Sequence, residues 1–345
     1  MDEIVITNAV GLCAKELSID SSIINGKSFY FGKINENLPK QKLRCNSILQ
    51  YLADKLDLSK YNKSDIGIVI ATTNAGIEEF ITSSDKHDAE LGNPAEFLKN
   101  YLGLDNYTAS ISTACSSGIK AFSLARKLLL NNVCSVVIVG GVDSIASPPS
   151  YGFHALEVFS QEKTNPFSKN RSGMNIGEAG ALFVVEKNKK GIKILGLGET
   201  SDAYHSATPD PEAKEAIRAI QIALNEAGLN PEDIDYINLH GTGTVSNDLM
   251  EAKAVYKIFK DKVPASSTKP ITGHCLGAAG SIETLFCYKI LKGEMKAPKH
   301  IYDGQYDEKL PKIKLVEKEL EKNINICMNN SFGFGGTNAV IILGK

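Results

Sequence analysis

The sequence predicts an α/β fold in which helices cover mixed or parallel sheets. Short apolar, β-branched runs alternate along the chain with longer segments of helical period, an order that is typical of sheets covered by helices. Some runs, such as residues 136–139 (Val-Val-Ile-Val), are apolar throughout, as burial of a strand on both faces requires. With 345 residues, 43% hydrophobic and 23% charged, the chain is long enough for one large α/β unit or about two domains.

In chain order, the strand candidates are residues 3–7, 66–71, 135–139, 181–185, 235–239 and 339–343. The helix candidates are residues 43–56, 116–130, 212–227 and 248–259. In the third of these, apolar residues recur at helical spacing, with Pro211 just before and Gly228 just after. A polar stretch at residues 186–191 predicts a boundary between halves 1–190 and 191–345. The segment 297–322, rich in charged residues and proline, predicts a surface loop.

The charge balance and the cysteines exclude several classes of protein. Lys and Arg number 38 against 40 Asp and Glu, so no overall basic field draws nucleic acid or an anionic membrane. Seven cysteines form no Cys-x-x-Cys pair, which disfavours a disulfide framework or a zinc site and suits a reducing cytosol. The N-terminus lacks a signal-peptide pattern, and no apolar run approaches the ~20 residues of a membrane helix. We therefore expect a cytoplasmic protein with no nucleic-acid, membrane or metal partner.

The first of four loops that suggest chemistry surrounds Cys115. Residues 112–118 are small, and an apolar helical run follows them. Backbone N–H groups at a helix N-terminus favour a thiolate and can also stabilise an oxyanion when that thiolate attacks a carbonyl. A small, buried structural cysteine remains the alternative at this point.

Two further loops each carry a histidine. His240, with Thr242 and Thr244, ends a strand-like run, where α/β sheets place their ligands. Lys269 and His274 stand five positions apart among small residues, ahead of a helix that carries Glu283, and could form one electropositive wall of a pocket. A structural histidine in the one loop, and a glycine-rich turn with a surface lysine in the other, remain the alternatives.

The fourth loop, residues 329–338, is rich in glycine but lacks the spacing and terminal Lys-Ser/Thr of a P-loop. Its glycines could let a backbone N–H approach a reacting carbonyl, with Phe332 and Phe334 as gates.

Together the four loops resemble the active-site motifs of β-ketoacyl-ACP synthases, the thiolase-fold condensing enzymes. The resemblance extends over nearly the whole chain and includes residues 165–167 (Asn-Pro-Phe), 171–173 (Arg-Ser-Gly), 177–180 (Gly-Glu-Ala-Gly) and 201–205 (Ser-Asp-Ala-Tyr-His). It implies a thiolase fold, with five layers in the order α-β-α-β-α built from two similar halves. The first half would carry the nucleophile and the second half both catalytic histidines.

The resemblance also implies a role for each motif residue. Cys115 would be the nucleophile, and His240 and His274 would complete a Cys-His-His set. Lys269 and Glu283 would organise the histidines electrostatically. The backbone N–H of Phe334 would form an oxyanion hole with that of Cys115, and its ring would gate the acyl pocket. The implied substrate-binding residues are Phe153, Thr242, Thr244, Phe332 and Gly333, of which the threonines would bind the pantetheine arm.

The implied reaction is a decarboxylative Claisen condensation. An acyl group transferred to Cys115 would be attacked by the enolate that malonyl-carrier protein leaves on losing CO₂. Decarboxylation drives this reaction, so no metal or redox cofactor is expected, and both substrates arrive on the phosphopantetheine of an acyl carrier protein. Fatty acid and polyketide biosynthesis are the pathways that the resemblance suggests.

The partners follow from charge and from the family. Carrier proteins are acidic, and Lys40, Lys42 and Arg44 stand where relatives place a basic docking patch. A merely solvated helix start is the alternative there. Family members pair, so we expect a homodimer, or a heterodimer with a ketosynthase-like subunit.

Some features depart from the family pattern. The chain is shortened mainly before Cys115, and Ser168 and Ser172 replace acidic residues. The shortened half, with residues 201–205 and 238–244, looks similar to ketosynthases of aryl-polyene clusters. Two rival readings are a non-catalytic chain-length partner, which would lack the nucleophile, and a thiolase, which would need a second catalytic cysteine near the C-terminus. The CoA-primed branch usually has Asn in place of one histidine, and His274 disfavours it.

Overall fold

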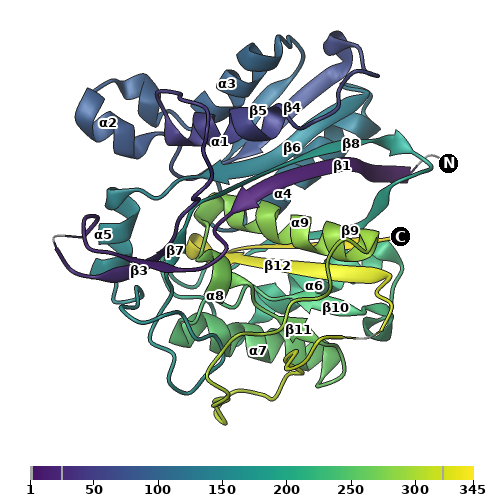
Figure 1. The fold of residues 1–345 in the computed structure, drawn as a ribbon. Helices are drawn as coiled ribbons and strands as arrows, with labels where there is room; N and C mark the ends of the chain where they lie inside the picture. The colour runs from purple at the N-terminus through teal and green to yellow at the C-terminus, as the bar shows by residue number, and fades with distance from the viewer. Residues whose placement is uncertain (1–2, 25, 321) are drawn as a thin grey trace.

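The computed structural model describes residues 3–24, 26–320 and 322–345 (Figure 1). Its elements stack in five layers, with a sheet in the second and fourth layers and helices in the first, third and fifth. The predicted α-β-α-β-α order is therefore confirmed. Within the described residues, no helix is long and apolar enough to span a membrane.

The first sheet contains strands from residues 3–188. Its order is β1 (Glu3–Cys13), β8 (Ala179–Asn188), β6 (Val136–Asp143), β4 (Ile66–Ala71) and β5 (Thr108–Ile111). The pairs β1–β8 and β8–β6 are antiparallel, and the pairs β6–β4 and β4–β5 are parallel. Every residue of β4 and β6 is buried, as their apolar sequences predicted.

The second sheet repeats this pattern with strands from residues 192–344. Its order is β9 (Ile192–Ser201), β13 (Thr337–Gly344), β12 (Ile326–Gly333), β10 (Tyr236–Asn238) and β11 (Ala265–Ser266). Here too the first two pairs are antiparallel and the last two parallel. Two residues of β1, Val5 and Ile6, pair with β9 and join the two sheets edge to edge.

Helices fill the other three layers. The helices α4 (Ser117–Leu130) and α9 (Ala279–Lys292) pack on each other between the sheets. The outer layers hold α1 (Arg44–Ala53) and α3 (Asn93–Leu102) on the first half, and α6 (Lys214–Ala227) and α7 (Val245–Phe259) on the second. Gly198 of β9 lets α6 approach closely, since a Cβ there would lie 1.9 Å from the Ala219 carbonyl oxygen.

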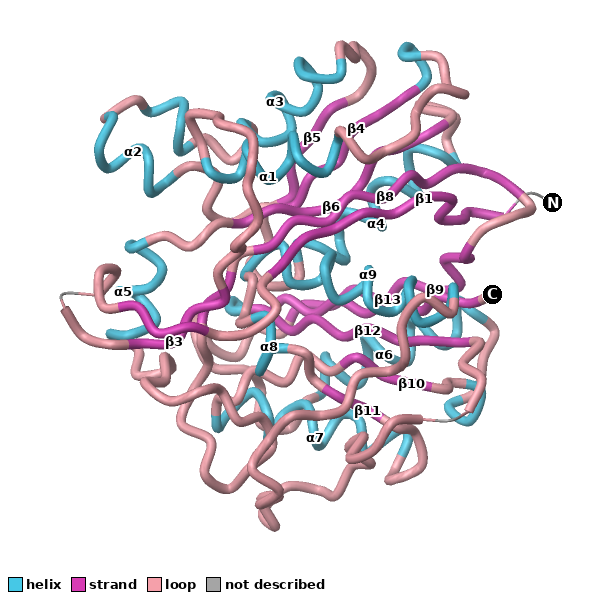
Figure 2. The backbone as a smooth tube through the Cα atoms, in the orientation of Figure 1, coloured by secondary structure: helices cyan, strands magenta, loops and turns pink. Residues whose placement is uncertain are grey.

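Smaller elements surround the sheets. They are the three-stranded sheet of β2 (Ser18–Asp20), β3 (Phe29–Gly32) and β7 (Ile176–Gly177), and the helices α2 (Ile77–Ser83), α5 (Ser147–Ala155) and α8 (Lys269–Thr272). Short 3₁₀ turns cover Lys63–Asp65, Lys86–Ala89, Pro231–Asp233, Leu276–Ala278 and Phe334–Gly336. The described residues of segment 297–322 form no helix or strand, as predicted, and Figure 2 shows how much loop backbone lies beside the second half.

The observed boundaries differ from the predicted ones for local reasons. The helix α6 begins at Lys214 rather than residue 212, because Ala213 is left-handed with φ 57°. The helix α7 begins at Val245 rather than residue 248, because the Thr244 side chain caps it. The strand β1 runs six residues beyond its predicted end at residue 7, and residues 329–333, predicted as loop, are the end of β12 and pair with β13.

Candidate active site

Loops from both halves of the chain meet around one pocket of about 560 Å³. Its wall contains all the residues predicted as nucleophile, imidazole, gate or substrate contact, namely Cys115, Phe153, His240, Thr242, Thr244, His274, Phe332, Gly333 and Phe334. Lys269 and Glu283 are not in this wall, and both are buried. The structure therefore brings together side chains that are up to 219 positions apart (Cys115 to Phe334) in the sequence.

Cys115 lies in a strained turn between β5 and α4. The preceding residue, Ala114, has φ 50°, a left-handed conformation that a residue with a Cβ rarely adopts. Ser117 holds the turn, because its hydroxyl donates to the Ala114 carbonyl at 2.6 Å and accepts the Thr113 N–H at 2.7 Å. This turn places the sulfur in the pocket.

The Cys115 sulfur is subject to opposing effects. Burial is the larger one and raises the pKa of the thiol to about 11. The Lys269 charge and the backbone N–H groups of Phe334 and Cys115 lower the same pKa. Burial outweighs these effects, so the resting residue is a thiol. The two N–H groups that face the sulfur are the pair predicted to form the oxyanion hole.

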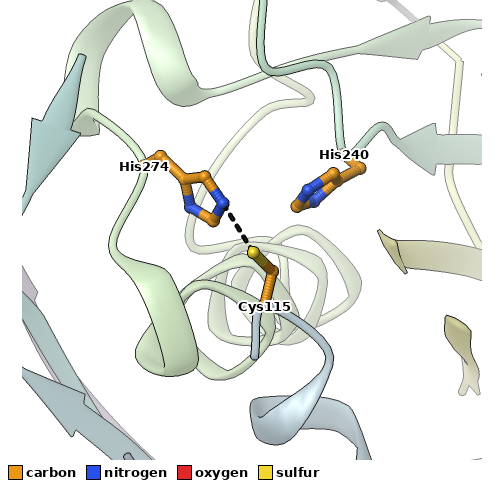
Figure 3. Close-up of side chains that lie close together, drawn as sticks. All are labelled: Cys115, His240 and His274. Carbon is orange, nitrogen blue, oxygen red and sulfur yellow. Dashed lines mark hydrogen bonds between the residues drawn. The ribbon is translucent and has the colours of Figure 1, made fainter. Parts of the chain in front are cut away.

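His274 contacts the nucleophile directly (Figure 3). Its Nε2 lies 3.0 Å from the Cys115 Sγ. On the other side of the ring, the backbone N–H of Leu276 donates to Nδ1 at 3.2 Å. A backbone N–H can only donate, so Nδ1 carries no hydrogen and Nε2 carries one. Burial first, and then the Lys269 charge, lower the pKa of His274 well below its usual value, which keeps the ring neutral.

His240 faces His274 across the pocket, with ring centroids 5.1 Å apart and planes at 85° (Figure 3). The Lys269 ammonium lies 3.4 Å from the Nδ1 of His240, so this ring too carries its hydrogen on Nε2. Burial, followed by Lys269 and His274, lowers the pKa of His240 well below its usual value. Glu251 of α7 holds the loop, because it accepts the N–H groups of His240 at 2.8 Å and Gly241 at 2.6 Å.

Lys269 and Glu283 form a buried ion pair behind His240. The lysine Nζ donates at 2.5 Å both to Glu283 Oε1 and to the His240 carbonyl. Each side chain is only 1% exposed. Burial raises the pKa of Glu283 to about 7, against the opposing effect of Lys269. The pair is therefore placed to orient His240 and to act on both imidazoles through its charge.

The protonation of the imidazoles also bears on metal binding. The ligand atoms of Cys115, His240 and His274 lie within 4.8 Å of one another, close enough to share an ion. A histidine binds a metal through a nitrogen without hydrogen. Because both Nδ1 atoms already face donors, both Nε2 atoms present a hydrogen to the pocket. The arrangement suits an oxygen that carries negative charge better than a cation.

Aromatic rings and one glycine shape the pocket around the sulfur. Phe153 of α5 meets Phe334, the predicted gate, edge to face, with ring centroids 5.5 Å apart. The ring of Phe332 lies edge to face with that of His240, with ring centroids 6.2 Å apart. A Cβ on Gly333 would lie 3.1 Å from the Cys115 nitrogen, so glycine allows the end of β12 to approach the nucleophile.

The two threonines lie in the pocket wall with their hydroxyl oxygens 3.0 Å apart. Thr244 also caps α7 by accepting the Asn247 N–H at 3.4 Å. The wall also contains residues that the sequence motifs did not predict, among them Val158, Met174 and the segment 207–209. The motif at residues 201–205 ends two positions before that segment, and it was the one sequence feature that could have indicated these wall residues.

The three residues of the predicted basic patch have different environments in the structure. Arg44 is tied inward, since its guanidinium donates to Glu178 at 2.7 Å and to the Ile34 carbonyl at 3.0 Å. Lys42 is exposed but paired with two aspartates of residues 85–88. Lys40 is exposed, and no ion pair among the described residues includes it. Only part of the predicted positive charge is therefore free to meet a partner.

The two serines that depart from the motif have distinct contacts. The Ser168 hydroxyl donates to Asp303 Oδ1 at 2.8 Å, and the Ser172 hydroxyl lies 2.7 Å from that of Ser160. Asp303 comes from the loop at 297–322, so a carboxylate still lies beside position 168, supplied from another part of the chain.

Comparisons with known proteins point to one family. The sequence model of the β-ketoacyl synthase N-terminal domain family matches residues 52–191, and that of the C-terminal domain family matches residues 192–302. The 3-oxoacyl-acyl-carrier-protein synthase 2 of Coxiella burnetii is 32% identical over 322 residues, covering 84% of this chain and 78% of the relative. Its namesake from Staphylococcus aureus strain COL is 31% identical over 322 residues, with the same coverage.

Solved structures show the same fold. A ketosynthase in complex with its chain length factor, from Xenorhabdus doucetiae, matches with a TM-score of 0.94 and 32% identity over 99% of this chain and 98% of that one. A β-ketoacyl synthase from Burkholderia phymatum has a TM-score of 0.89 at 21% identity, with complete coverage of both chains. The thiolase fold implied by the sequence motifs is thereby confirmed.

Proposed function

The chain belongs to the β-ketoacyl synthase family, and we propose that it catalyses a decarboxylative condensation in which Cys115 carries the growing acyl chain. The observation that carries this proposal is the meeting of the Cys115 sulfur, two neutral imidazoles and two backbone N–H groups in one pocket.

In the first half-reaction, the Cys115 sulfur attacks the thioester of an acyl-carrier protein. As the sulfur–carbon bond forms, the bond from the carbonyl carbon to the carrier sulfur breaks, and the proton that the Cys115 thiol loses is matched by the one that the departing carrier thiolate takes up. The carbonyl oxygen becomes an oxyanion, which the N–H groups of Cys115 and Phe334 stabilise. The acyl group is left on Cys115 beside the Phe153–Phe334 gate.

In the second half-reaction, malonyl-carrier protein loses CO₂ and leaves an enolate. The Nε2–H groups of His240 and His274 donate to the enolate oxygen, which is the reason for fixing both tautomers. The enolate carbon attacks the Cys115 thioester, the carbon–sulfur bond breaks, and the Cys115 sulfur leaves and takes up a proton from solvent, which frees a β-ketoacyl-carrier protein. The loss of CO₂ supplies the driving force, so the reaction calls for neither a metal nor a redox cofactor.

The finer assignment concerns partners and pathway. We propose acyl carrier proteins as the partners that deliver both substrates, and a dimer with either a second copy or a ketosynthase-like subunit. The similarity to a ketosynthase that is complexed with its chain length factor supports the second form. We also propose a cytoplasmic location and, from residues 201–205 and the short first half, a place in aryl-polyene synthesis.

The assembled site disfavours the rival readings. A non-catalytic partner would not need a nucleophile in contact with a neutral imidazole, as Cys115 and His274 are. A thiolase would need a second cysteine at the site, yet Cys327 is buried in β12, and Cys115 is the one cysteine among the described residues of the pocket wall. Both histidines are present, which disfavours the CoA-primed branch.

The test is the intact mass of the protein after incubation with a panel of acyl-carrier proteins. We expect the mass of one acyl group on the wild type and on Cys13→Ala, a control at a half-buried cysteine. Cys115→Ala should gain no mass and form no β-ketoacyl product with malonyl-carrier protein. Full condensation by Cys115→Ala would refute the proposal, and the acyl groups accepted would define chain length.

A further inference from the structure

Asp143, at the end of β6, is a fully buried carboxylate outside the pocket wall. All its described hydrogen-bond partners are donors, and they come from two places in the fold. Its Oδ1 accepts the Thr72 hydroxyl at 2.8 Å and the N–H groups of Thr73 at 3.0 Å and Asn74 at 2.8 Å. Its Oδ2 accepts the Thr73 hydroxyl at 2.9 Å and the N–H groups of Thr73 at 3.1 Å and Gly277 at 2.7 Å.

The Gly277 contact is the one that leads to the active site. Gly277 follows Leu276, whose own N–H donates to His274 Nδ1 at 3.2 Å. Leu276 has φ 51°, so the turn is held in a conformation that its own backbone does not favour. A Cβ on Gly277 would lie 2.8 Å from Asp143 Oδ2, which shows how closely the carboxylate and the turn approach.

We propose that Asp143 is a positioning residue for His274, which it holds in the Nε2–H tautomer by anchoring the Leu276–Gly277 turn from the other half of the chain. The carboxylate accepts the Gly277 N–H, which fixes the turn so that the Leu276 N–H points at the Nδ1 of His274. Nε2 is left to donate to the enolate oxygen. The catalytic consequence rests on the function proposed above, whereas the tautomer itself does not.

Asp143→Asn is the direct variant. An amide NH₂ would face two backbone N–H groups at either position, those of Thr73 and Asn74 at Oδ1 and those of Thr73 and Gly277 at Oδ2. With the NH₂ at Oδ2 the hydrogen bond to Gly277 is lost, and with the NH₂ at Oδ1 an uncharged oxygen accepts the Gly277 N–H more weakly than the carboxylate does. We expect a mixture of His274 tautomers and a loss of malonyl-carrier-protein decarboxylation of about tenfold, below the ~10²–10³ for removing such a donor outright.

The tautomer is read from the ¹⁵N chemical shifts of histidine-labelled protein, with the His274 signals assigned by their absence in His274→Ala. This measurement needs no substrate, so it tests Asp143 even if the proposed reaction is wrong. A folded Asp143→Asn protein with a single Nε2–H tautomer and unchanged decarboxylation would overturn the proposal.

A matched pair of variants decides the case if Asp143→Asn does not fold. Thr73→Val removes the hydroxyl that shares Oδ2 with Gly277, whereas Thr72→Val removes the one on Oδ1. Thr72 is fully buried and also accepts the Ala75 N–H, so Thr72→Val should lower the melting temperature more. Thr73→Val should nevertheless shift the His274 signals more. The same order for both quantities would overturn the proposal, because it would reduce Asp143 to a general stabilising role.

Discussion

The two halves of the chain repeat one pattern of strands but place different chemistry on equivalent loops. The loop between β5 and α4 in the first half carries Cys115, and the equivalent connection between β11 and α9 in the second half carries His274. The loop after β4 carries Thr72 and Thr73, whereas the loop after β10 carries His240. A symmetric scaffold thus supports an asymmetric site, with one sulfur from the first half and both imidazoles from the second.

The loops also differ in what holds them. The His240 loop is secured within its own half, by Glu251 through the backbone and by Lys269 through the ring. The His274 loop depends on the other half, because Asp143 anchors its turn and Cys115 meets its ring. The orientation of His240 is therefore determined by contacts within one half, whereas that of His274 depends on how the two halves pack.

The largest effect should come from breaking the support within the second half. Lys269→Met leaves Glu283 buried without its cation, which should reduce the free energy of unfolding in urea by about 3–5 kcal/mol. The pKa of Glu283 is already raised to about 7, and losing Lys269 raises it further. The folded state then binds a proton that the unfolded state releases, so the stability deficit should grow as pH rises from 6 to 8.

Two controls sharpen this prediction. Lys269→Met combined with Glu283→Gln should recover most of the lost stability, since no buried charge is left unpaired. Lys292→Met removes an exposed lysine from the end of α9 and should change stability by only about 0.5 kcal/mol or less. A deficit in Lys269→Met that does not depend on pH would show that Glu283 is not the cause.

The next effect concerns the two imidazoles. His274→Ala removes a donor to the enolate, and we expect decarboxylation of malonyl-carrier protein to fall by about 10²–10³. Acylation of Cys115 should fall less, because the N–H groups of Cys115 and Phe334 that stabilise its oxyanion remain. Intact mass reports acylation and CO₂ release reports decarboxylation in the same sample. Equal losses in both steps would contradict this division of roles.

The motifs predicted the side chains of the site, but not the backbone groups and distant partners that hold them. Cys115, His240 and His274 have recognisable neighbours in sequence, so their meeting could be predicted. The role of Asp143 could not, because Gly277 and Asn74 reach it through backbone N–H groups, which have no sequence signature. Glu178, which neutralises Arg44, lies 134 positions away in the chain.

The fold shows the same limit. Residues 329–333 look like a loop because asparagine, serine and glycine disfavour strands. They form a strand because all five pair with β13, and Asn329 also pairs with β10, which local composition does not reveal. The strands β4 and β6 were predictable because both are buried on both faces, and their sequences are therefore apolar along most of their length.

A smaller effect tests whether the second half tunes the nucleophile of the first. With the pKa of Cys115 at about 11, its alkylation by iodoacetamide should accelerate about tenfold per pH unit from 7.5 to 9.5, with no plateau. Lys269 lowers this pKa more than Glu283 raises it, so the Lys269→Met/Glu283→Gln protein should react more slowly at each pH. Cys115→Ala gives the background from other cysteines. A plateau below pH 9 would mean that the resting residue is a thiolate.

The smallest effect asks whether the first half also supplies the carrier-protein contact. Lys40→Glu places a negative charge at an exposed position, and we expect a rise in KM for acyl-carrier protein of a few-fold, about 0.2–1 kcal/mol, with kcat unchanged. Lys262→Glu, an exposed control beyond the end of α7, should leave KM unaltered. Arg44→Glu should act differently, because it places a second carboxylate against Glu178 and so lowers stability rather than carrier affinity. An unchanged KM in Lys40→Glu at low salt, where surface charge acts most strongly, would remove this helix start from the docking surface.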